Sequence, residues 1–199
     1  MRTACVLVRH EMRLLASLAL WAARRTHGTA GGQAFGYARG QGAVLSGFAF
    51  VCVVETFTMS VLLRGWPLLH RVVLFLDVYT VVFVVALYAA HMVRPHVLDR
   101  TCLRARRAAH VDLRIPLERI GTVRRELRTV HERREGELDL PVGSQTSITL
   151  ELTEPVVHLT FFGHSRPVRV VRFHADDADR VVRALTQARS ARPQGDPVT

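Results

Sequence analysis

The chain has 199 residues, 49% of them hydrophobic, and its 27 basic side chains outnumber its 17 acidic ones to give a formal net charge of +10. This length holds one soluble domain of about a hundred residues plus a membrane segment, and it excludes two independent globular units. Two nearly uncharged runs lie between residues 43 and 93, while most charges lie before residue 40 or after residue 93. That distribution is typical of a membrane protein.

The first segment, residues 1–42, combines an amphipathic stretch with a glycine-rich link. Its longest uncharged run, residues 14–23, is too short to cross a bilayer. On a helix, one face holds Leu7, Leu14, Leu18 and Trp21, and another holds Arg9, Arg13, Ser17 and Arg24. We expect a helix lying in the membrane interface, with a packed cytoplasmic helix or a cleaved signal peptide as alternatives. Residues 27–42 show no apolar period, which predicts a flexible link.

Two apolar runs, residues 43–63 and 72–93, are each long enough to cross a bilayer as a helix of roughly 30 Å. The break between them, residues 64–71, contains a glycine and a proline that favour a turn, together with Trp66 as an interfacial anchor. The pattern therefore predicts an antiparallel transmembrane hairpin.

Arginines flank this hairpin mainly at its two ends. Those ends carry Arg24, Arg25, Arg39, Arg94, Arg100, Arg104, Arg106 and Arg107, whereas the loop carries Arg64 and Arg71. Basic residues near spans favour the cytoplasmic side, so we expect both termini in the cytoplasm. The basic residues are all arginine, which is typical of a high-GC bacterial genome. Together with the two predicted spans, we therefore expect a multi-pass protein of the bacterial plasma membrane.

Two acids fall inside the predicted spans, and each costs several kcal/mol there unless it is neutralised or paired. Counting from the loop puts Glu55 level with Tyr79 and Thr80, and Asp77 level with Thr58. Three interpretations remain open: hydrogen bonding between helices or protomers, tolerance near an interface, and a proton or ion relay. A small-residue spacing in the first span, at positions 43 and 47, is compatible with close helix packing.

Beyond residue 94 the hydrophobic period changes from helical to alternating. We predict strands at 102–107, 111–116, 122–128, 138–142, 147–153, 156–162 and 168–174. Asp176 is a plausible N-cap for a closing helix with an apolar stripe. The predicted fold is thus a membrane α-helical hairpin plus a small α+β cytoplasmic domain, residues 94–188, with a seven-stranded sheet or open barrel and a C-terminal helix. Residues 189–199 are expected to be disordered.

Part of this domain resembles a known family. Residues 97–106 (VLDRTCLRAR), followed by 111–123 (VDLRIPLERIGTV), look like the start of bacterial PH-like domains, which have a strand bearing a basic residue and then an isoleucine-proline-leucine-x-x-isoleucine stretch. Residues 170–185 resemble the last strand and helix of that fold. The whole chain resembles two-span membrane proteins of actinobacteria. The resemblance implies a binding or scaffolding module without catalytic residues, and the charged segment 129–137 has no counterpart in it.

The sequence carries no signature of catalysis or of a cofactor. The three cysteines are far apart, and the ten histidines lack metal-ligand spacing. Nucleophile, zinc and nucleotide motifs do not occur, and the strands lack the aromatic and basic interleaving of a nucleic-acid platform. We therefore expect no enzyme activity, cofactor, metal or nucleic acid.

Four arginines on the first two predicted strands are candidates for contact with anionic lipid headgroups. They are Arg104, Arg106, Arg107 and Arg114. A solvated basic face is an equally good interpretation.

The sequence as a whole predicts an integral membrane protein that presents a binding or scaffolding domain at the cytoplasmic face. Its expected partners are the bilayer and either an unknown protein or a second copy of the chain. The alternative is an oligomeric ion-conducting or transporter accessory subunit that uses Glu55 and Asp77.

Overall fold

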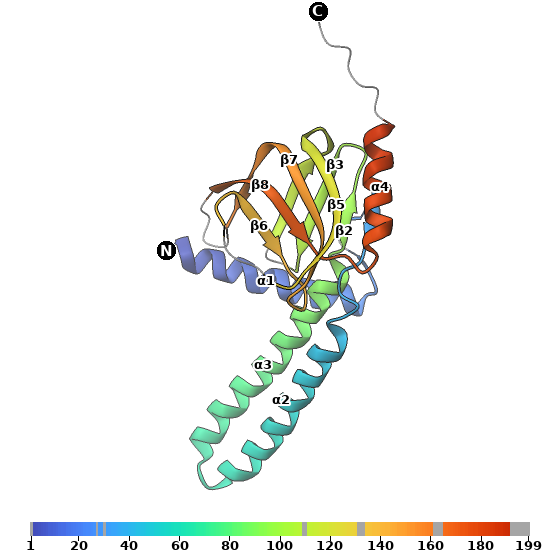
Figure 1. Ribbon diagram of the computed structural model, residues 1–199. Helices are drawn as coiled ribbons and strands as arrows, with labels where there is room; N and C mark the ends of the chain where they lie inside the picture. Colours follow the sequence, from blue (N-terminus) through green and yellow to red (C-terminus); the bar gives the residue numbers. More distant parts are fainter. Residues whose placement is uncertain are drawn as a thin grey trace, which may run out of the picture.

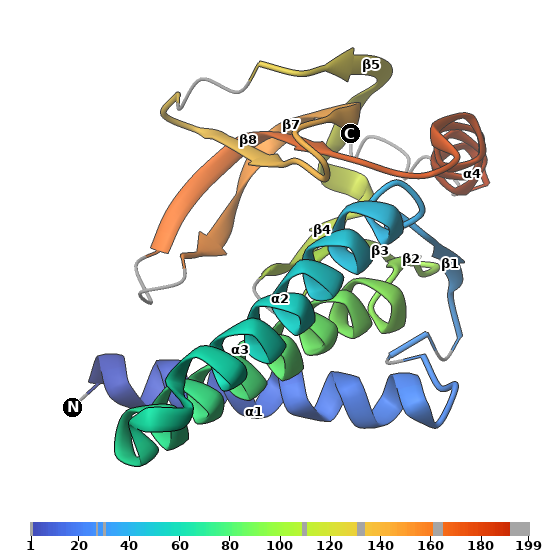
Figure 2. The ribbon, with the colours of Figure 1, turned by 90° about the horizontal axis from the view of Figure 1, so that it is seen from below.

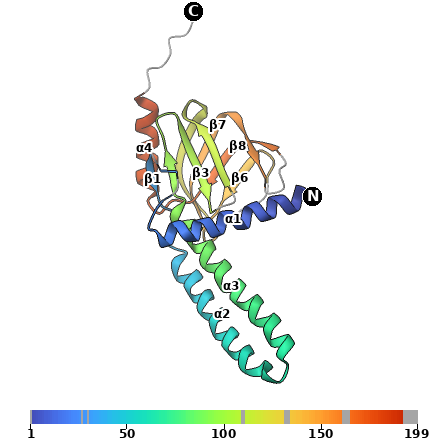
Figure 3. The same ribbon diagram turned by 180° about the vertical axis from the view of Figure 1, so that it is seen from behind.

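A computed structural model describes residues 2–191 except 27, 30, 109, 110, 131–133 and 161–164 (Figure 1). A helical hairpin projects from one end of a two-sheet region, and a further helix crosses the junction between them (Figures 1 and 3). The helices are α1 (Arg2–Ala22), α2 (Gly42–Leu62), α3 (Pro67–Val93) and α4 (Ala178–Ser190). The predicted combination of a helical hairpin with a small α+β region is confirmed.

The hairpin consists of α2 and α3, joined by the 3-10 turn Leu63–Gly65. Both predicted spans are helical, but the second helix begins at Pro67 instead of at residue 72. Proline suits the first turn of a helix because its missing N–H needs no partner there. The loop is consequently shorter than predicted, and this changes which residues of the two helices lie opposite each other.

A seam of half-buried and buried side chains joins the two helices at coiled-coil spacing. On α2 it contains Leu45, Ala49, Cys52, Thr56 and Met59, and on α3 it contains His70, Val73, Asp77, Val81 and Val84. The Ser60 hydroxyl lies 3.5 Å from His70 Nε2, and a Cβ added at Gly42 would lie 3.4 Å from the Tyr88 hydroxyl.

These two contacts fix the register of the seam. They put Asp77 level with Val53, and Glu55 level with Phe75. The predicted levels, Asp77 with Thr58 and Glu55 with Tyr79 and Thr80, were wrong because the loop was assumed to be longer.

Helix α1 packs on the side of α3 that faces away from α2 (Figure 2). Leu14 is buried against Ala86 and Ala90, whose small side chains let the two helices approach closely. Ser17 was expected on the polar face of this helix. It is instead fully buried and accepts a hydrogen bond from Arg94 Nε at 3.1 Å.

Two four-stranded sheets form the rest of the protein. The first has the order β1 (Gln33–Phe35), β2 (His96–Leu98), β3 (Cys102–Arg107), β4 (Val111–Pro116) and is antiparallel throughout. The second has the order β5 (Ile120–Arg128), β7 (Thr146–Leu159), β8 (Ser165–Phe173), β6 (Glu137–Leu140), and only β6 and β8 run parallel. The short 3-10 turn Leu117–Arg119 leads from β4 into β5.

A single hydrophobic core lies between the two sheets and α4. Its fully buried side chains include Leu103, Ile115, Leu150, Val171, Phe173, Val181 and Leu185. The alternation of apolar and polar residues along each strand explains this core, because every second side chain points inward.

Most predicted strands are present, with two differences. The strands predicted at 147–153 and 156–162 fall on one long strand, β7, which ends at residue 159 and is interrupted by an irregularity between residues 151 and 156. Residues 161 and 162 of the second prediction lie outside the described residues. The sequence analysis also missed β1 and β2. Both are three residues long and too short to show an alternating pattern.

Within the predicted flexible link, residues 31–42 form an ordered part of the fold around β1, and residues 27 and 30 lie outside the described residues. The Asp176 backbone N–H donates to the Gly36 carbonyl at 2.9 Å, and an Asp176 carboxylate oxygen accepts from the Arg39 N–H at 3.1 Å. Asp176 therefore holds this segment in place and is not the N-cap of α4. That cap is Asp177, whose side chain accepts from the Arg180 N–H at 2.9 Å. Within the predicted tail, residues 189 and 190 are helical, and residues 192–199 lie outside the described residues.

Candidate functional site

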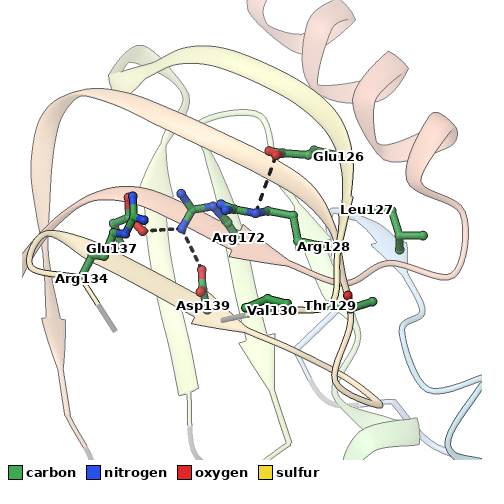
Figure 4. Close-up of a pocket in the computed structure, with 9 residues that line it drawn as sticks. All are labelled: Glu126, Leu127, Arg128, Thr129, Val130, Arg134, Glu137, Asp139 and Arg172. Atoms are coloured by element: carbon green, nitrogen blue, oxygen red, sulfur yellow. Dashed lines mark hydrogen bonds and ion pairs between the residues drawn. The ribbon is translucent and has the colours of Figure 1, made fainter. Parts of the chain in front are cut away.

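A polar cavity of about 360 Å³ opens on the face of the second sheet that is turned away from the core (Figure 4). Side chains from the end of β5, the segment after it, β6 and β8 line this cavity. They are Glu126, Leu127, Arg128, Thr129, Val130, Arg134, Glu137, Asp139 and Arg172. Part of the lining belongs to the charged segment that has no counterpart in the PH-like pattern.

Arg172 lies at the centre of this cavity with 9% of its side chain exposed. One terminal nitrogen donates to a Glu137 carboxylate oxygen at 2.6 Å and to an Asp139 carboxylate oxygen at 3.1 Å (Figure 4). The parallel pairing of β6 and β8 puts Asp139 beside Arg172. The hydrogen bond with Glu137 raises the pKa of Arg172 and lowers the pKa of Glu137.

Two further charged side chains of the cavity, those of Glu126 and Arg128, form an ion pair. Glu126 accepts a hydrogen bond from the Thr149 hydroxyl at 2.9 Å, and its other oxygen lies 3.7 Å from Arg128 Nε. The described lining holds three carboxylates and three guanidinium groups but no histidine, cysteine or serine. Such a surface offers ion pairs and hydrogen bonds to a small zwitterion or a charged peptide.

A second cluster joins the base of the hairpin to the first sheet. His96 is fully buried, its Nδ1 accepts from the Arg106 backbone N–H at 3.0 Å, and its Nε2 lies 2.8 Å from the His174 carbonyl oxygen. Because an N–H can only donate and a carbonyl can only accept, His96 is neutral with its proton on Nε2. Burial lowers the pKa of His96 to about 4.

Tyr37 completes this cluster from the linker side. Its ring lies 4.7 Å from the ring of His96 and 5.9 Å from that of His91, measured between centroids. Its hydroxyl accepts a hydrogen bond from the Ala108 N–H at 2.8 Å, and burial raises its pKa to about 12. The linker, the end of α3 and two strands are thereby fixed to one another.

The four arginines proposed for lipid contact separate into two pairs. Arg104 and Arg106 both form ion pairs with Asp112, and the Arg106 side chain is only 3% exposed. Arg107 and Arg114 are exposed. The first pair is held by an acid on the neighbouring strand, so Arg107 and Arg114 are the more exposed of the four.

The polar residues of the hairpin point in different directions. Glu55 is exposed on the outside of α2, whereas Asp77 lies in the seam with one carboxylate oxygen buried and without a partner among the described residues. The hydroxyls expected to pair with these acids bond elsewhere. Tyr79 donates to Glu11 at 2.6 Å, Thr58 to the Val54 carbonyl and Thr80 to the Leu76 carbonyl, both at 2.9 Å.

The sequence analysis did not identify the cavity or the Tyr37 and His96 cluster. A local signal existed for the cavity, since Glu137 and Asp139 are two residues apart and share a face of β6, but the strand predicted at 138–142 began one residue too late to include Glu137. Their partner Arg172 depends on which strands become neighbours, and local periodicity does not contain that information.

No protein-family model, curated protein or solved structure matches this chain in the comparisons made. Among the described residues, no group of three or more histidine, cysteine, aspartate or glutamate side chains is arranged to hold a metal ion.

Proposed function

We propose that this chain is an integral membrane protein of the bacterial plasma membrane, in which the hairpin spans the bilayer and the two-sheet domain binds a partner at the cytoplasmic face. The observation that carries the proposal is the exposure of the hairpin. Both helices are long and apolar enough to cross a membrane, and only 6% and 17% of their most apolar windows are buried. Helices from the core of a soluble protein are mostly buried, so these apolar surfaces need another environment.

The dimensions of the hairpin fit a bilayer. Trp66 lies at the hairpin turn, and Tyr88 lies at the opposite end of α3, where its ring contacts that of Trp21. A rise of about 1.5 Å per residue separates Trp66 and Tyr88 by about 33 Å, close to the hydrocarbon thickness. Tryptophan and tyrosine favour the two membrane interfaces. Asp77 is midway between these anchors, which argues against tolerance near an interface as its explanation.

Helix α1 is proposed to lie in the membrane interface on the side of the domain, and its contact with Tyr79 through Glu11 requires the hairpin to tilt towards it. It crosses the base of the hairpin and leaves Met12 and Leu15 exposed (Figures 1 and 2). Arginines are concentrated at this end of the hairpin, which supports a cytoplasmic location for α1, the domain and both termini. The exposed Arg107 and Arg114 remain candidates for contact with anionic headgroups.

The domain is proposed to be a PH-like binding module without enzyme activity. Two largely antiparallel sheets around one core, closed by α4, support the resemblance. The charged cavity around Arg172 is the proposed contact site for a polar or charged segment of a protein partner. The transport alternative has weaker support, because Glu55 and Asp77 point to different faces and line no common path within one chain.

Protease treatment of cells and vesicles tests this proposal. Protease added to intact cells should leave the domain undigested, whereas protease added to inverted membrane vesicles should remove it. The protein should also float with the vesicles after extraction at high pH. Digestion of the domain in intact cells contradicts the topology, and loss of the protein into the soluble fraction contradicts membrane insertion.

The partner-binding role is tested separately by crosslinking in membranes through a photoreactive residue at Val130, which is 70% exposed beside the cavity. The crosslinked partner should be lost with Arg172→Ala but not with Arg183→Ala on α4. Capture that does not depend on Arg172 contradicts the proposed contact site.

A further inference from the structure

The carboxyl group of Glu55 on α2 lies within the proposed hydrocarbon region without a hydrogen-bond or ion-pair partner among the described residues. In the part of the chain that the structure describes, Glu55 is exposed and forms no hydrogen bond or ion pair. It is level with Phe75 of α3 and therefore close to the midpoint between the aromatic anchors. A carboxyl group in contact with lipid at that depth costs several kcal/mol, so this position favours a protein surface that covers it.

The side chains around Glu55 form a continuous strip at the spacing of helix–helix contacts. This Glu55 face consists of Val44, Gly47, Val51, Glu55, Thr58 and Leu62, all of them exposed. It lies away from the seam with α3, and α1 packs on the far side of α3. The described part of the chain therefore leaves the Glu55 face uncovered.

The Glu55 face has room for the close approach of another helix. A Cβ added at Gly47 would meet nothing within 4 Å, so a neighbouring backbone has room at this position. Small residues favour such contacts in membranes, where packing and hydrogen bonds replace the hydrophobic driving force.

We propose that a second copy of this chain covers the Glu55 face, in a parallel dimer in which two protonated Glu55 side chains hydrogen-bond each other. Copies inserted with the same orientation and related by a two-fold axis bring like residues together. A neutral carboxylic acid is self-complementary, because it has one O–H donor and one carbonyl acceptor. The described parts of α2 and α3 between the aromatic anchors offer no lysine or arginine near the middle of the bilayer that could form an ion pair with Glu55. A second copy instead offers another neutral carboxyl group.

This inference rests on the proposed function, because it requires the hairpin to lie in a bilayer. It adds a partner and a contact surface to the anchor. Lipid then meets the remaining outer surfaces of the hairpin, and the two domains lie on the same side of the membrane.

Disulfide crosslinking of the full chain in liposomes tests the surface. With the native cysteines replaced by serine, Val51→Cys should form a covalent dimer. Phe57→Cys is the matched control, since this residue is 74% exposed on the same helix but points away from the Glu55 face. Equal crosslinking at both positions, or none at Val51→Cys, overturns the proposal.

Dimerisation measured by energy transfer between labelled copies in liposomes tests the chemistry. Glu55→Leu should weaken association about tenfold, as expected for the loss of two intramembrane hydrogen bonds, and Glu55→Gln should weaken it by less because the amide keeps a donor and an acceptor. Gly47→Ile should also weaken it, whereas Ser46→Ile, on another exposed face, should not.

The outcomes separate this inference from the proposed function. Failure of the chain to float with liposomes contradicts both. A chain that floats but stays monomeric, or whose association is unchanged by Glu55→Leu, contradicts the dimer alone. Crosslinking of Val51→Cys to a different protein in cells, without a covalent dimer, assigns the face to a hetero-partner and also contradicts the dimer.

Discussion

The two-sheet domain buries large apolar side chains, whereas the helical hairpin exposes them. Phe173 in the domain is fully buried, whereas Phe75 in the hairpin is 71% exposed. Asp179 in the domain is exposed, whereas Asp77 of the hairpin lies half-buried in the seam. This difference is the one expected if the domain is surrounded by water and the hairpin by lipid, as we propose.

The largest effect should come from a matched pair of phenylalanines. Phe173→Ala should lower the free energy of unfolding of the domain by about 3–5 kcal/mol, because it leaves a cavity in the core. Phe75→Ala should change it by less than about 1 kcal/mol, since this ring packs against no protein core. Chemical denaturation in detergent micelles measures both. Equal losses would remove the distinction between the two regions.

The pH dependence of stability should report on the junction between them. The pKa of His96 is about 4 in the folded protein and about 6.5 in the unfolded chain, so the unfolded chain binds the proton more readily. Stability should therefore be full above about pH 6.5 and fall as the pH drops towards 4, by about 3 kcal/mol from this group. His96→Gln should flatten this part of the curve. An unchanged slope would show that His96 is not buried in its neutral form.

Removing the central charge of the cavity should have a smaller effect. Arg172→Ala leaves Glu137 and Asp139 close together without their shared counter-charge, which should destabilise the domain by about 2 kcal/mol. Arg124→Ala is the control, because its ion pair with Glu151 is exposed and should contribute less than about 1 kcal/mol. Thermal unfolding at neutral pH compares them, and a smaller loss for Arg172→Ala would contradict its structural importance.

The smallest effect should come from the contact between α1 and the hairpin. Ala90→Leu overfills the site where Leu14 packs and should cost about 1 kcal/mol, the lower end of the usual cost of overpacking, because release of α1 relieves the crowding. A disulfide between Leu14→Cys and Ala90→Cys, in an otherwise cysteine-free chain, measures the docked state directly. Failure of this disulfide to form would contradict the packing of α1 on α3.

The features predicted correctly from the sequence are those encoded by local patterns. The two apolar runs predicted helices, and alternation predicted β3 and β4 with the bounds that the structure shows. The errors arise where a result depends on the length of a turn or on distant neighbours. The position of Asp77 changed because a proline began the helix five residues earlier, and Arg172 acquired its carboxylates through a parallel pairing that local periodicity does not reveal.

The linker around β1 shows a third reason why part of the fold could not be predicted from the sequence. Its glycines predicted flexibility, yet Phe35 and Tyr37 are buried and β1 extends a sheet by main-chain hydrogen bonds. Main-chain pairing depends little on side-chain pattern, so a three-residue strand leaves almost no trace in the sequence.

The most direct test of the central claim, that the hairpin crosses a bilayer, is a depth profile of spin labels along α3. Labels at Leu68, Phe75 and Met92, which are 77%, 71% and 45% exposed, are attached one at a time in a cysteine-free chain in liposomes. Relative accessibility to oxygen and to a water-soluble nickel reagent then reports the depth of each label. The label at Phe75 should be the deepest, and those at Leu68 and Met92 should lie near the two surfaces. A label at Phe75 as accessible to the nickel reagent as the other two would contradict the account.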